Sequence, residues 1–260
     1  MRTQIKNSKR KEEDELIKAR TYSVVKHNDL IQKSRHQLTL QEQKIVLYLI
    51  SKLKPSDKDF ENQVFSISEF CNVCGLDSDN GGNYSYIKNT LKSLRDRSIW
   101  ITLEDGSETT LSWINKVTLN KRSGTVLLRL DNDMKPYLLQ LQGNFTKYEL
   151  LYTLAMRSQY SVRLYELLKS YQYKKHVIFD IDEFKRLIYA EQYERYPDFK
   201  RKVIDIALRE INGLTDISVT YSPIKIGKRF AEVSFEISPK KALERWGAGQ
   251  TTIKALDKTN

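Results

Sequence analysis

Residues 64–70 read Val-Phe-Ser-Ile-Ser-Glu-Phe, and residues 178–184 read Ile-Phe-Asp-Ile-Asp-Glu-Phe. The apolar positions and the Glu-Phe pair coincide at an offset of 114 residues. Each copy alternates like a short strand and then places Ser68 or Asp182 where it could cap a helix. A repeated pattern of this kind predicts one structural unit used twice.

A second match follows each copy and extends the repeat. Apolar residues at helical spacing occur near 87–99 and again near 199–211, at an offset of 112. An amphipathic helix precedes each copy (41–53 and 162–173), and each half ends in two strand-like segments around a Gly-bearing turn, Lys121–Gly124 and Lys225–Arg229. Helix, strand, two helices and a two-stranded wing describe a winged helix. Because amphipathic helices resemble one another in sequence, the alternative to a true internal repeat is a chance similarity between the two halves.

The predicted fold class is therefore α+β, with two tandem winged-helix domains related by an internal repeat. We expect a flexible charged segment at 1–20, domains at 21–130 and 131–240, and a flexible tail at 241–260.

The chain has 260 residues and a formal net charge of +11. The excess is spread evenly, with +3 in each of residues 1–20, 21–130 and 131–240 and +2 in 241–260. This excess positive charge indicates nucleic-acid binding only if folding gathers the basic side chains on one face of the protein. The sequence has neither a long apolar run nor an apolar leader, so we expect a cytoplasmic protein that binds no membrane.

The third helix of a winged helix enters the major groove, and the hairpin contacts the flanking backbone. On a helical wheel of the second half, apolar residues fill one arc and polar residues the other. Lys200 falls inside the apolar arc and is usable only because it lies in the first turn. The predicted DNA contacts of this half are Lys200, Arg201, Lys202, Asp205 and Arg209 on the helix and Lys225, Lys228 and Arg229 on the wing.

The first half has a similar but weaker pattern. Its third helix turns polar side chains away from Ile87, Leu91 and Leu94. The predicted contacts are Ser85, Lys88, Asn89 and Lys92 on the helix and Lys121 and Arg122 on the wing. A lysine-bearing outer face is also typical of a merely solvated surface. The coincidence of basic third helices with basic wings favours DNA.

Other motifs do not indicate catalysis. Cys71 and Cys74 form a CxxC without a second ligand pair, so core packing is expected rather than zinc or redox chemistry. The fifteen tyrosines suggest a DNA-nicking enzyme, but no His-x-His exists to hold the metal of such an enzyme. No phosphate-binding Gly-x-x-x-x-Gly-Lys-Ser/Thr loop is present. We expect no enzyme activity, metal or cofactor.

Several segments resemble the plasmid replication initiator family, the iteron-binding proteins with tandem winged-helix domains. They are 28–31, 38–44, 136–146, 161–168 and 196–202 leading to 210–212, and the resemblance covers roughly residues 24–240. It implies binding to direct repeats at an origin, a homodimer in equilibrium with the monomer, repression at an inverted-repeat operator, origin opening, and recruitment of the host replication initiator and helicase.

The resemblance carries the family's Phe followed by three basic residues onto Phe199-Lys200-Arg201-Lys202, which would enter the major groove. Lysines partly replace the usual arginines, and lysine lacks the planar fork that reads guanine. Arg201 is therefore the expected base reader. A winged-helix transcriptional repressor without a replication role is the alternative function, and a tyrosine nickase is a third.

The sequence also bears on the dimer. Leu127 and Leu128 are adjacent in a predicted strand, so one of them should face away from its own core. An exposed apolar hairpin favours pairing with a second chain, whereas a helix over 138–154 could instead cover that face.

Overall fold

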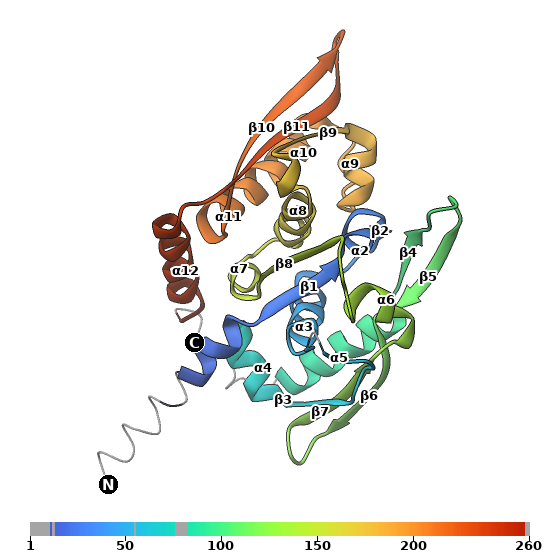
Figure 1. Cartoon of the computed structure of the whole chain (residues 1–260), viewed down its shortest axis with the longest axis vertical. Coiled ribbons are helices and arrows are strands. Elements are labelled where there is room, and N and C mark those ends of the chain that lie inside the picture. Colours follow the sequence, from blue (N-terminus) through green and yellow to red (C-terminus); the bar gives the residue numbers. More distant parts are fainter. Residues whose placement is uncertain (1–10, 12–13, 55, 76–82, 258–260) are drawn as a thin grey trace.

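The computed structural model describes residues 11, 14–54, 56–75 and 83–257. It forms two similar units, one above the other in Figure 1, joined by helices and a two-stranded sheet. The lower unit contains β1 (Ser23–His27), α2 (Asn28–Gln32), β2 (Ser34–Arg35), α3 (Leu40–Ser51), β3 (Gln63–Ser66), α4 (Ile67–Cys74), α5 (Asn83–Asp96), β4 (Ser98–Thr102), β5 (Glu108–Ser112), β6 (Ile114–Asn120) and β7 (Thr125–Leu130).

The connecting elements are a 3-10 turn (Asn132–Met134), α6 (Lys135–Leu138), β8 (Phe145–Glu149), α7 (Leu151–Leu154), α8 (Gln159–Ser170) and a second 3-10 turn (Gln172–Lys174). The upper unit contains β9 (His176–Asp180), α9 (Ile181–Leu187), α10 (Tyr196–Phe199), a π-helical turn (Lys200–Ile204), α11 (Asp205–Leu214), β10 (Ile217–Ile226), β11 (Arg229–Pro239) and α12 (Ala242–Asp257).

The internal repeat is confirmed in the sheets. β3 pairs with β7, which pairs with β6, and in the same order β9 pairs with β11, which pairs with β10, all antiparallel. Each sheet thus consists of the first repeated strand plus the two strands of the wing. The repeated Phe70 and Phe184 are both buried at the centre of their units. The α+β class and the two tandem winged helices predicted from the sequence are correct.

The helix caps lie two residues earlier than predicted. Ser66, not Ser68, accepts a hydrogen bond from the backbone N–H of Glu69, and Asp180, not Asp182, accepts from Asp182 and Glu183. The two caps occupy equivalent places in the repeat. Either Ser of 66 and 68, and either Asp of 180 and 182, has capping chemistry. The helices start at Ile67 and Ile181, whose side chains are buried, so the earlier residue becomes the cap.

The lower unit contains a further hairpin, β4–β5, that forms a separate sheet with β2. β4 follows the third helix α5 as β10 follows α11, but β4 pairs with β2 and β5 and does not belong to the wing. The counterpart of β10 is β6, because β6 pairs with β7 in the lower wing as β10 pairs with β11 in the upper wing.

The segment between the units ties them together. β8 pairs with β1 along its whole length, although the predicted division at residue 130 places them in different domains. Arg163 of α8 donates to the carbonyls of Ser34 in the lower unit and Leu187 in the upper one, at 2.9 and 3.0 Å. Beside it, Lys26 and Glu166 form a buried ion pair of 2.6 Å, and Tyr148 donates its hydroxyl hydrogen to Glu166.

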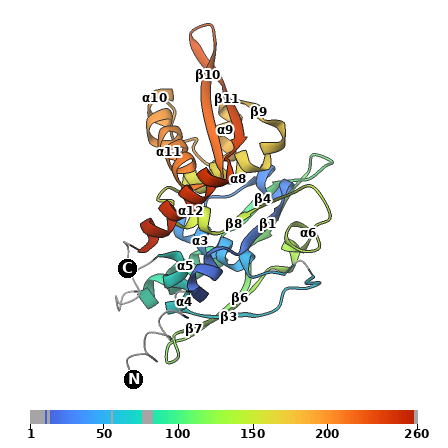
Figure 2. The same cartoon turned by 60° about the vertical axis from the view of Figure 1, so that its left-hand side comes forward.

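The C-terminal residues form a packed helix, so the prediction of a flexible tail is wrong for residues 242–257. α12 runs from the upper unit to the lower one (Figures 1 and 2). Leu256 is buried against Gly75, the left-handed residue that ends α4. Asp257 pairs with Arg20 at 3.0 Å. Arg20 is itself buried, so the predicted flexible segment 1–20 is anchored at its end, while residues 1–10 and 12–13 lie outside the described part.

Candidate nucleic-acid interface

The third helix of the upper unit is continuous over α10, the π-helical turn and α11. Its inner side is apolar, and Phe199, Val203, Ile204, Ala207 and Ile211 are fully buried. In the π turn the backbone N–H of Asp205 donates to the carbonyl of Lys200, five residues earlier. The wider turn lets both Val203 and Ile204 reach the core while Lys200 stays accessible to solvent. Such π turns recur at functional sites in helices.

Lys200, Arg201 and Lys202 each have an acidic or aromatic neighbour. Lys200 Nζ lies 2.6 Å from Asp205 Oδ1, and Arg201 Nη2 lies 3.3 Å from Asp198 Oδ1. The Arg201 side chain is 74% exposed. Lys202 lies over a tyrosine ring, 5.8 Å from its centre, and Arg209 is exposed about two turns further along the helix. All five predicted helix residues are therefore accessible on one helix.

The upper wing is held against the start of this helix by aromatic side chains. Tyr196 stacks on Phe230 of β11 with ring centres 3.8 Å apart. The hydroxyl group of Tyr196 also forms a hydrogen bond with the hydroxyl group of Tyr221 on β10. Lys225 also lies over the ring of Phe230, 4.6 Å from its centre. These three aromatic residues fix the angle between wing and helix. The sequence prediction missed them, although Tyr and Phe on facing elements are an ordinary signal of packing.

The three predicted wing residues have different surroundings. Lys228 is exposed at the tip, next to Gly227, whose φ of 63° suits a tight turn. Arg229 turns back to Asp182 in the first turn of α9, with 2.7 Å between Nη2 and Oδ2. Lys225 is exposed on the strand beside the aromatic cluster. All three residues therefore lie at or next to the tip of the wing, where Ile226 pairs with Arg229 and Lys225 with Phe230.

In the lower unit, α5 is the equivalent helix. Ile87, Leu91 and Leu94 are buried, and the predicted contacts Ser85, Lys88, Asn89 and Lys92 are all exposed. Lys121 and Arg122 are exposed at the tip of the β6–β7 wing. Asn120 shapes this tip by accepting from the backbone N–H groups of Arg122 and Ser123, which is an Asx turn.

The fold places the third helices of the two units on one side of the molecule. Figure 2 shows α10 and α11 above α5 on the left, with the β10–β11 hairpin at the top and the β6–β7 hairpin at the bottom. Two basic helices with wings at opposite ends form an extended surface. Its charge and shape suit a duplex lying along both units.

Lys240 supports the far end of the upper helix, a role that the sequence prediction also missed. Its Nζ donates to the carbonyl of Asn212, in the last turn of α11, at 2.5 Å and to that of Thr215, which follows the helix, at 2.8 Å. A lysine at a helix C-terminus satisfies unpaired carbonyls and the helix dipole. Desolvation at this position lowers the pKa of Lys240.

The CxxC motif lies in the core of the lower unit. Cys71 and Cys74 are both buried in α4, and burial raises the pKa of the Cys74 thiol to about 12. Within residues 14–54, 56–75 and 83–257, no group of three or more His, Cys, Asp or Glu side chains converges on a common point. Over the same residues no helix has the length and apolar character needed to cross a membrane.

Comparison with known proteins agrees with this architecture. The family model described as the initiator replication protein WH1 domain matches residues 23–169, and that of the initiator Rep protein WH2 domain matches residues 180–237. The PI protein of Escherichia coli is 29% identical over 148 aligned positions, and the match covers 50% of this chain and 48% of that protein. A replication initiation protein of Escherichia coli is 30% identical over 179 aligned positions, and the match covers 65% of this chain and 54% of that protein.

The chain thus spans about half the length of these curated relatives. A crystal structure of the Pi initiator protein in complex with iteron DNA has a similar fold. Its TM-score is 0.68 at 24% identity, covering 85% of this chain and 99% of that one. The WH1 match alone covers more than half of the chain, and the WH2 match follows it in order. The chain therefore belongs to the initiator replication protein family, with a WH1 domain followed by a WH2 domain.

Proposed function

We propose that this protein initiates plasmid replication by binding repeated duplex DNA sites at the origin with both winged helices. The observation that carries the proposal is the placement of the two basic third helices on one side of the molecule (Figure 2). Membership of the initiator family supports it, as does the fold shared with a Pi initiator that was crystallised with iteron DNA. Direct repeats are the expected targets.

Each helix would enter a major groove, and each wing would contact the flanking phosphates. Recognition elements on one face of B-DNA reach successive major grooves about 34–36 Å apart. One chain would then cover a site of about two helical turns. Arg201 would read bases, because its planar guanidinium matches guanine, whereas Lys200 and Lys202 would contact phosphates or single acceptors.

The proposal includes a homodimer in equilibrium with the monomer, with the dimer repressing the chain's own promoter at an inverted repeat. Leu127 of β7 supports this part. It is only half-buried and pairs across the sheet with Val64, which is 61% exposed. An apolar patch on a wing sheet is suited to cover by a second copy of the chain.

The chain would act in the cytoplasm without catalysis or a cofactor of its own. It would open the origin through binding energy and then recruit the host replication initiator and helicase. The tyrosine nickase alternative is weakened by the surroundings of several tyrosines. Burial raises the pKa of Tyr148, Tyr152 and Tyr165, which makes their hydroxyls poor nucleophiles.

Two experiments separate the proposal from its rivals. A plasmid that carries this gene and its flanking DNA, with no other initiator, should replicate in a suitable host, whereas a pure repressor would not sustain it. Incubating the purified chain with supercoiled origin DNA should leave no covalent protein–DNA adduct. A 5′-phosphotyrosine adduct would support the nickase instead.

A further inference from the structure

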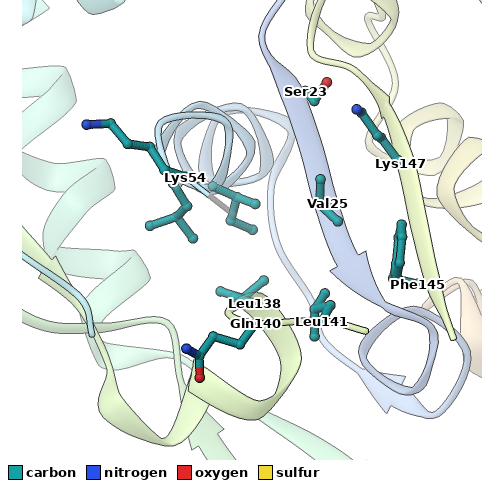
Figure 3. A pocket seen from close by; sticks show the side chains of 10 residues that line it. Ser23, Val25, Lys54, Leu138, Gln140, Leu141, Phe145 and Lys147 are labelled. Carbon is teal, nitrogen blue, oxygen red and sulfur yellow. The ribbon is translucent and has the colours of Figure 1, made fainter. Parts of the chain in front are cut away.

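A pocket of about 180 Å³ opens on the solvent side of the β1–β8 sheet (Figure 3). Side chains along a strand alternate between two faces, so Val25 of β1 and Phe145 of β8 face the pocket while Val24 and Tyr148 enter the core. The lining comes from β1, the end of α3 and the residues after it, α6 with the loop that follows it, and β8, and it includes Lys54, Leu138, Leu141, Phe145 and Lys147.

The size and lining of this pocket indicate what it can hold. Pockets for drug-sized molecules and cofactors measure about 300–1,000 Å³, so this one is too small for such a ligand. Its walls are mainly aliphatic, and Phe145 at its edge is 42% exposed. A space of this size and polarity accepts one large apolar side chain, which is how protein interfaces anchor their central residues.

The rim of the pocket is positively charged. Lys54 and Lys147 are both exposed, and the lining contains neither Asp nor Glu. Charge complementarity therefore selects an acidic segment as the occupant. Residues 1–10 of this chain contain four basic and no acidic residues, so their charge is opposite to the one required.

The wall formed by the loop after α6 is held in place before any partner arrives. Gln140 and Asn144 both have a φ of 52°, in the left-handed region that residues other than glycine seldom occupy. Asn28 fixes the second of them: its backbone N–H donates to the carbonyl of Asn144 at 2.7 Å, and its side-chain amide donates to the side chain at 2.9 Å. Strained loops of this kind persist where the surroundings determine them, often at binding sites.

The pocket also lies away from the candidate DNA surface. In Figure 2, α6 is on the right of the molecule, whereas α5, α10 and α11 are on the left. A partner in the pocket and a duplex on the helices could therefore be bound together. We propose that this pocket docks an acidic segment of a host replication protein, which inserts one large apolar side chain between Leu138, Leu141 and Phe145. This inference rests on the proposed function.

The direct test is fluorescence anisotropy with the full chain and a short fluorescein-labelled peptide rich in Asp and Glu with one central Phe. A twin peptide with Ser in place of the Phe is the control for the apolar anchor. We expect Phe145→Glu and the double variant Lys54→Glu/Lys147→Glu each to weaken binding by about tenfold, equivalent to about 1.4 kcal/mol. Lys241→Glu, an exposed lysine on another part of the surface, should leave binding unchanged.

The charge-reversed variant offers a rescue that misfolding cannot imitate. A peptide of the same length with Lys in place of Asp and Glu should bind Lys54→Glu/Lys147→Glu better than it binds the parent chain. Three results would overturn the proposal: no binding of the acidic peptide to the parent chain, equal binding of the Ser twin, or equal weakening by Lys241→Glu.

A second readout separates this inference from the proposed function. Phe145→Glu should bind origin DNA like the parent chain but support less origin-dependent replication in a host-cell extract. If it binds DNA and replicates like the parent, the docking proposal is wrong and the initiator function stands. If the parent chain itself fails to bind origin DNA, the proposed function is wrong.

Discussion

Lys200 and Asp205 are joined twice, through the backbone and through their side chains. The N–H of Asp205 donates to the carbonyl of Lys200 across the π turn, and Lys200 Nζ donates to both carboxylate oxygens of Asp205, at 2.6 and 2.8 Å. The five-residue π spacing stacks one residue above the other, whereas an ideal α-helix places residues five apart on different faces. The candidate DNA-contacting lysine is therefore paired with a carboxylate in the free protein.

Releasing this lysine should change DNA binding more than stability. In Asp205→Asn, Lys200 loses its counter-charge and becomes free to bind a phosphate. We expect tighter binding to non-specific duplex and a steeper salt dependence, by about 0.9 in the slope of log affinity against log salt. Both side chains are nearly half exposed, so unfolding free energy should fall by less than about 1 kcal/mol. A weaker, less specific complex would mean that Asp205 itself contacts bases.

Arg201 should be the main source of base preference in the upper helix. Its side chain is 74% exposed and only loosely paired with Asp198. Arg201→Ala should cost about 1–3 kcal/mol on the specific site and relax preference at one position, as measured by gel-shift titration with single-base variants. Arg245→Ala on α12 is the matched control. Unchanged affinity and specificity in Arg201→Ala would show that another face of the helix meets DNA.

The upper wing should contribute affinity without specificity. Replacing Lys225, Lys228 and Arg229 together by Ala should weaken binding to all sequences alike. The slope of log affinity against log salt should fall by about 0.9 for each phosphate that the wing no longer binds. Because Arg229 already pairs with Asp182, Lys228→Ala alone should lower this slope by the amount expected for one phosphate contact. A slope that does not change would mean that the hairpin stays clear of the DNA backbone.

The dimer prediction concerns a single residue. Leu128 is fully buried, so Leu127 is the outward-facing member of the pair. Leu127→Lys should shift the monomer–dimer equilibrium toward monomer, because a charge would replace apolar contact at the interface. Sedimentation at several protein concentrations measures this, with Lys241→Glu, an exposed lysine outside the wing sheet, as a surface control. If the parent chain is one monomeric species up to tens of micromolar, the dimer proposal fails while DNA binding is unaffected.

The folded chain should lose stability in mild acid through His36. Its Nδ1 is buried without a hydrogen-bond partner, and Trp113 packs edge-on against the ring with centres 5.7 Å apart. Burial, with Arg163 and Lys26 nearby, lowers the pKa of His36 well below 6.5. Below about pH 6.5 the His36 imidazole is therefore protonated in the unfolded chain but stays neutral in the folded chain. The free energy of unfolding consequently falls as the pH falls.

This loss can approach about 1.4 kcal/mol per pH unit. Urea denaturation between about pH 7 and about pH 5 measures it. His36→Phe keeps a ring against Trp113 and removes the titrating group, so its stability should depend less on pH over that range. An unchanged pH dependence in His36→Phe would assign the effect to other groups.

The repeat is readable from the sequence because it rests on buried positions. Phe70 and Phe184, with the strands before them, occupy equivalent core sites, so the spacing of apolar residues is tightly constrained. The exposed faces of both third helices follow from the same periodicity. The π turn does not, because a wheel of 100° per residue assumes regular α geometry, and such a wheel places Lys200 among the core residues.

The C-terminal helix could not be predicted from local signals. Gly247 and Gly249 each weaken a helix by about 1 kcal/mol relative to Ala, and the surrounding composition is typical of a loop. Tertiary contacts stabilise α12 instead: Leu256 fills the space beside Gly75, and Thr252 bonds a backbone carbonyl at the end of α11 at 3.2 Å. The aromatic contacts of Tyr196 likewise join residues far apart in the chain, so no local pattern indicates them.

Hydroxyl-radical footprinting on the DNA that flanks the gene is the most direct measurement of the central claim, that both winged helices bind one face of a repeated duplex site. We predict regular direct repeats, each protected on one side of the duplex across about two successive turns. The substitution Lys88→Ala/Lys92→Ala should remove protection from one half of each repeat, and Arg201→Ala from the other. Protection confined to a single turn, or losses that fall on the same half for both variants, would contradict binding by two recognition helices.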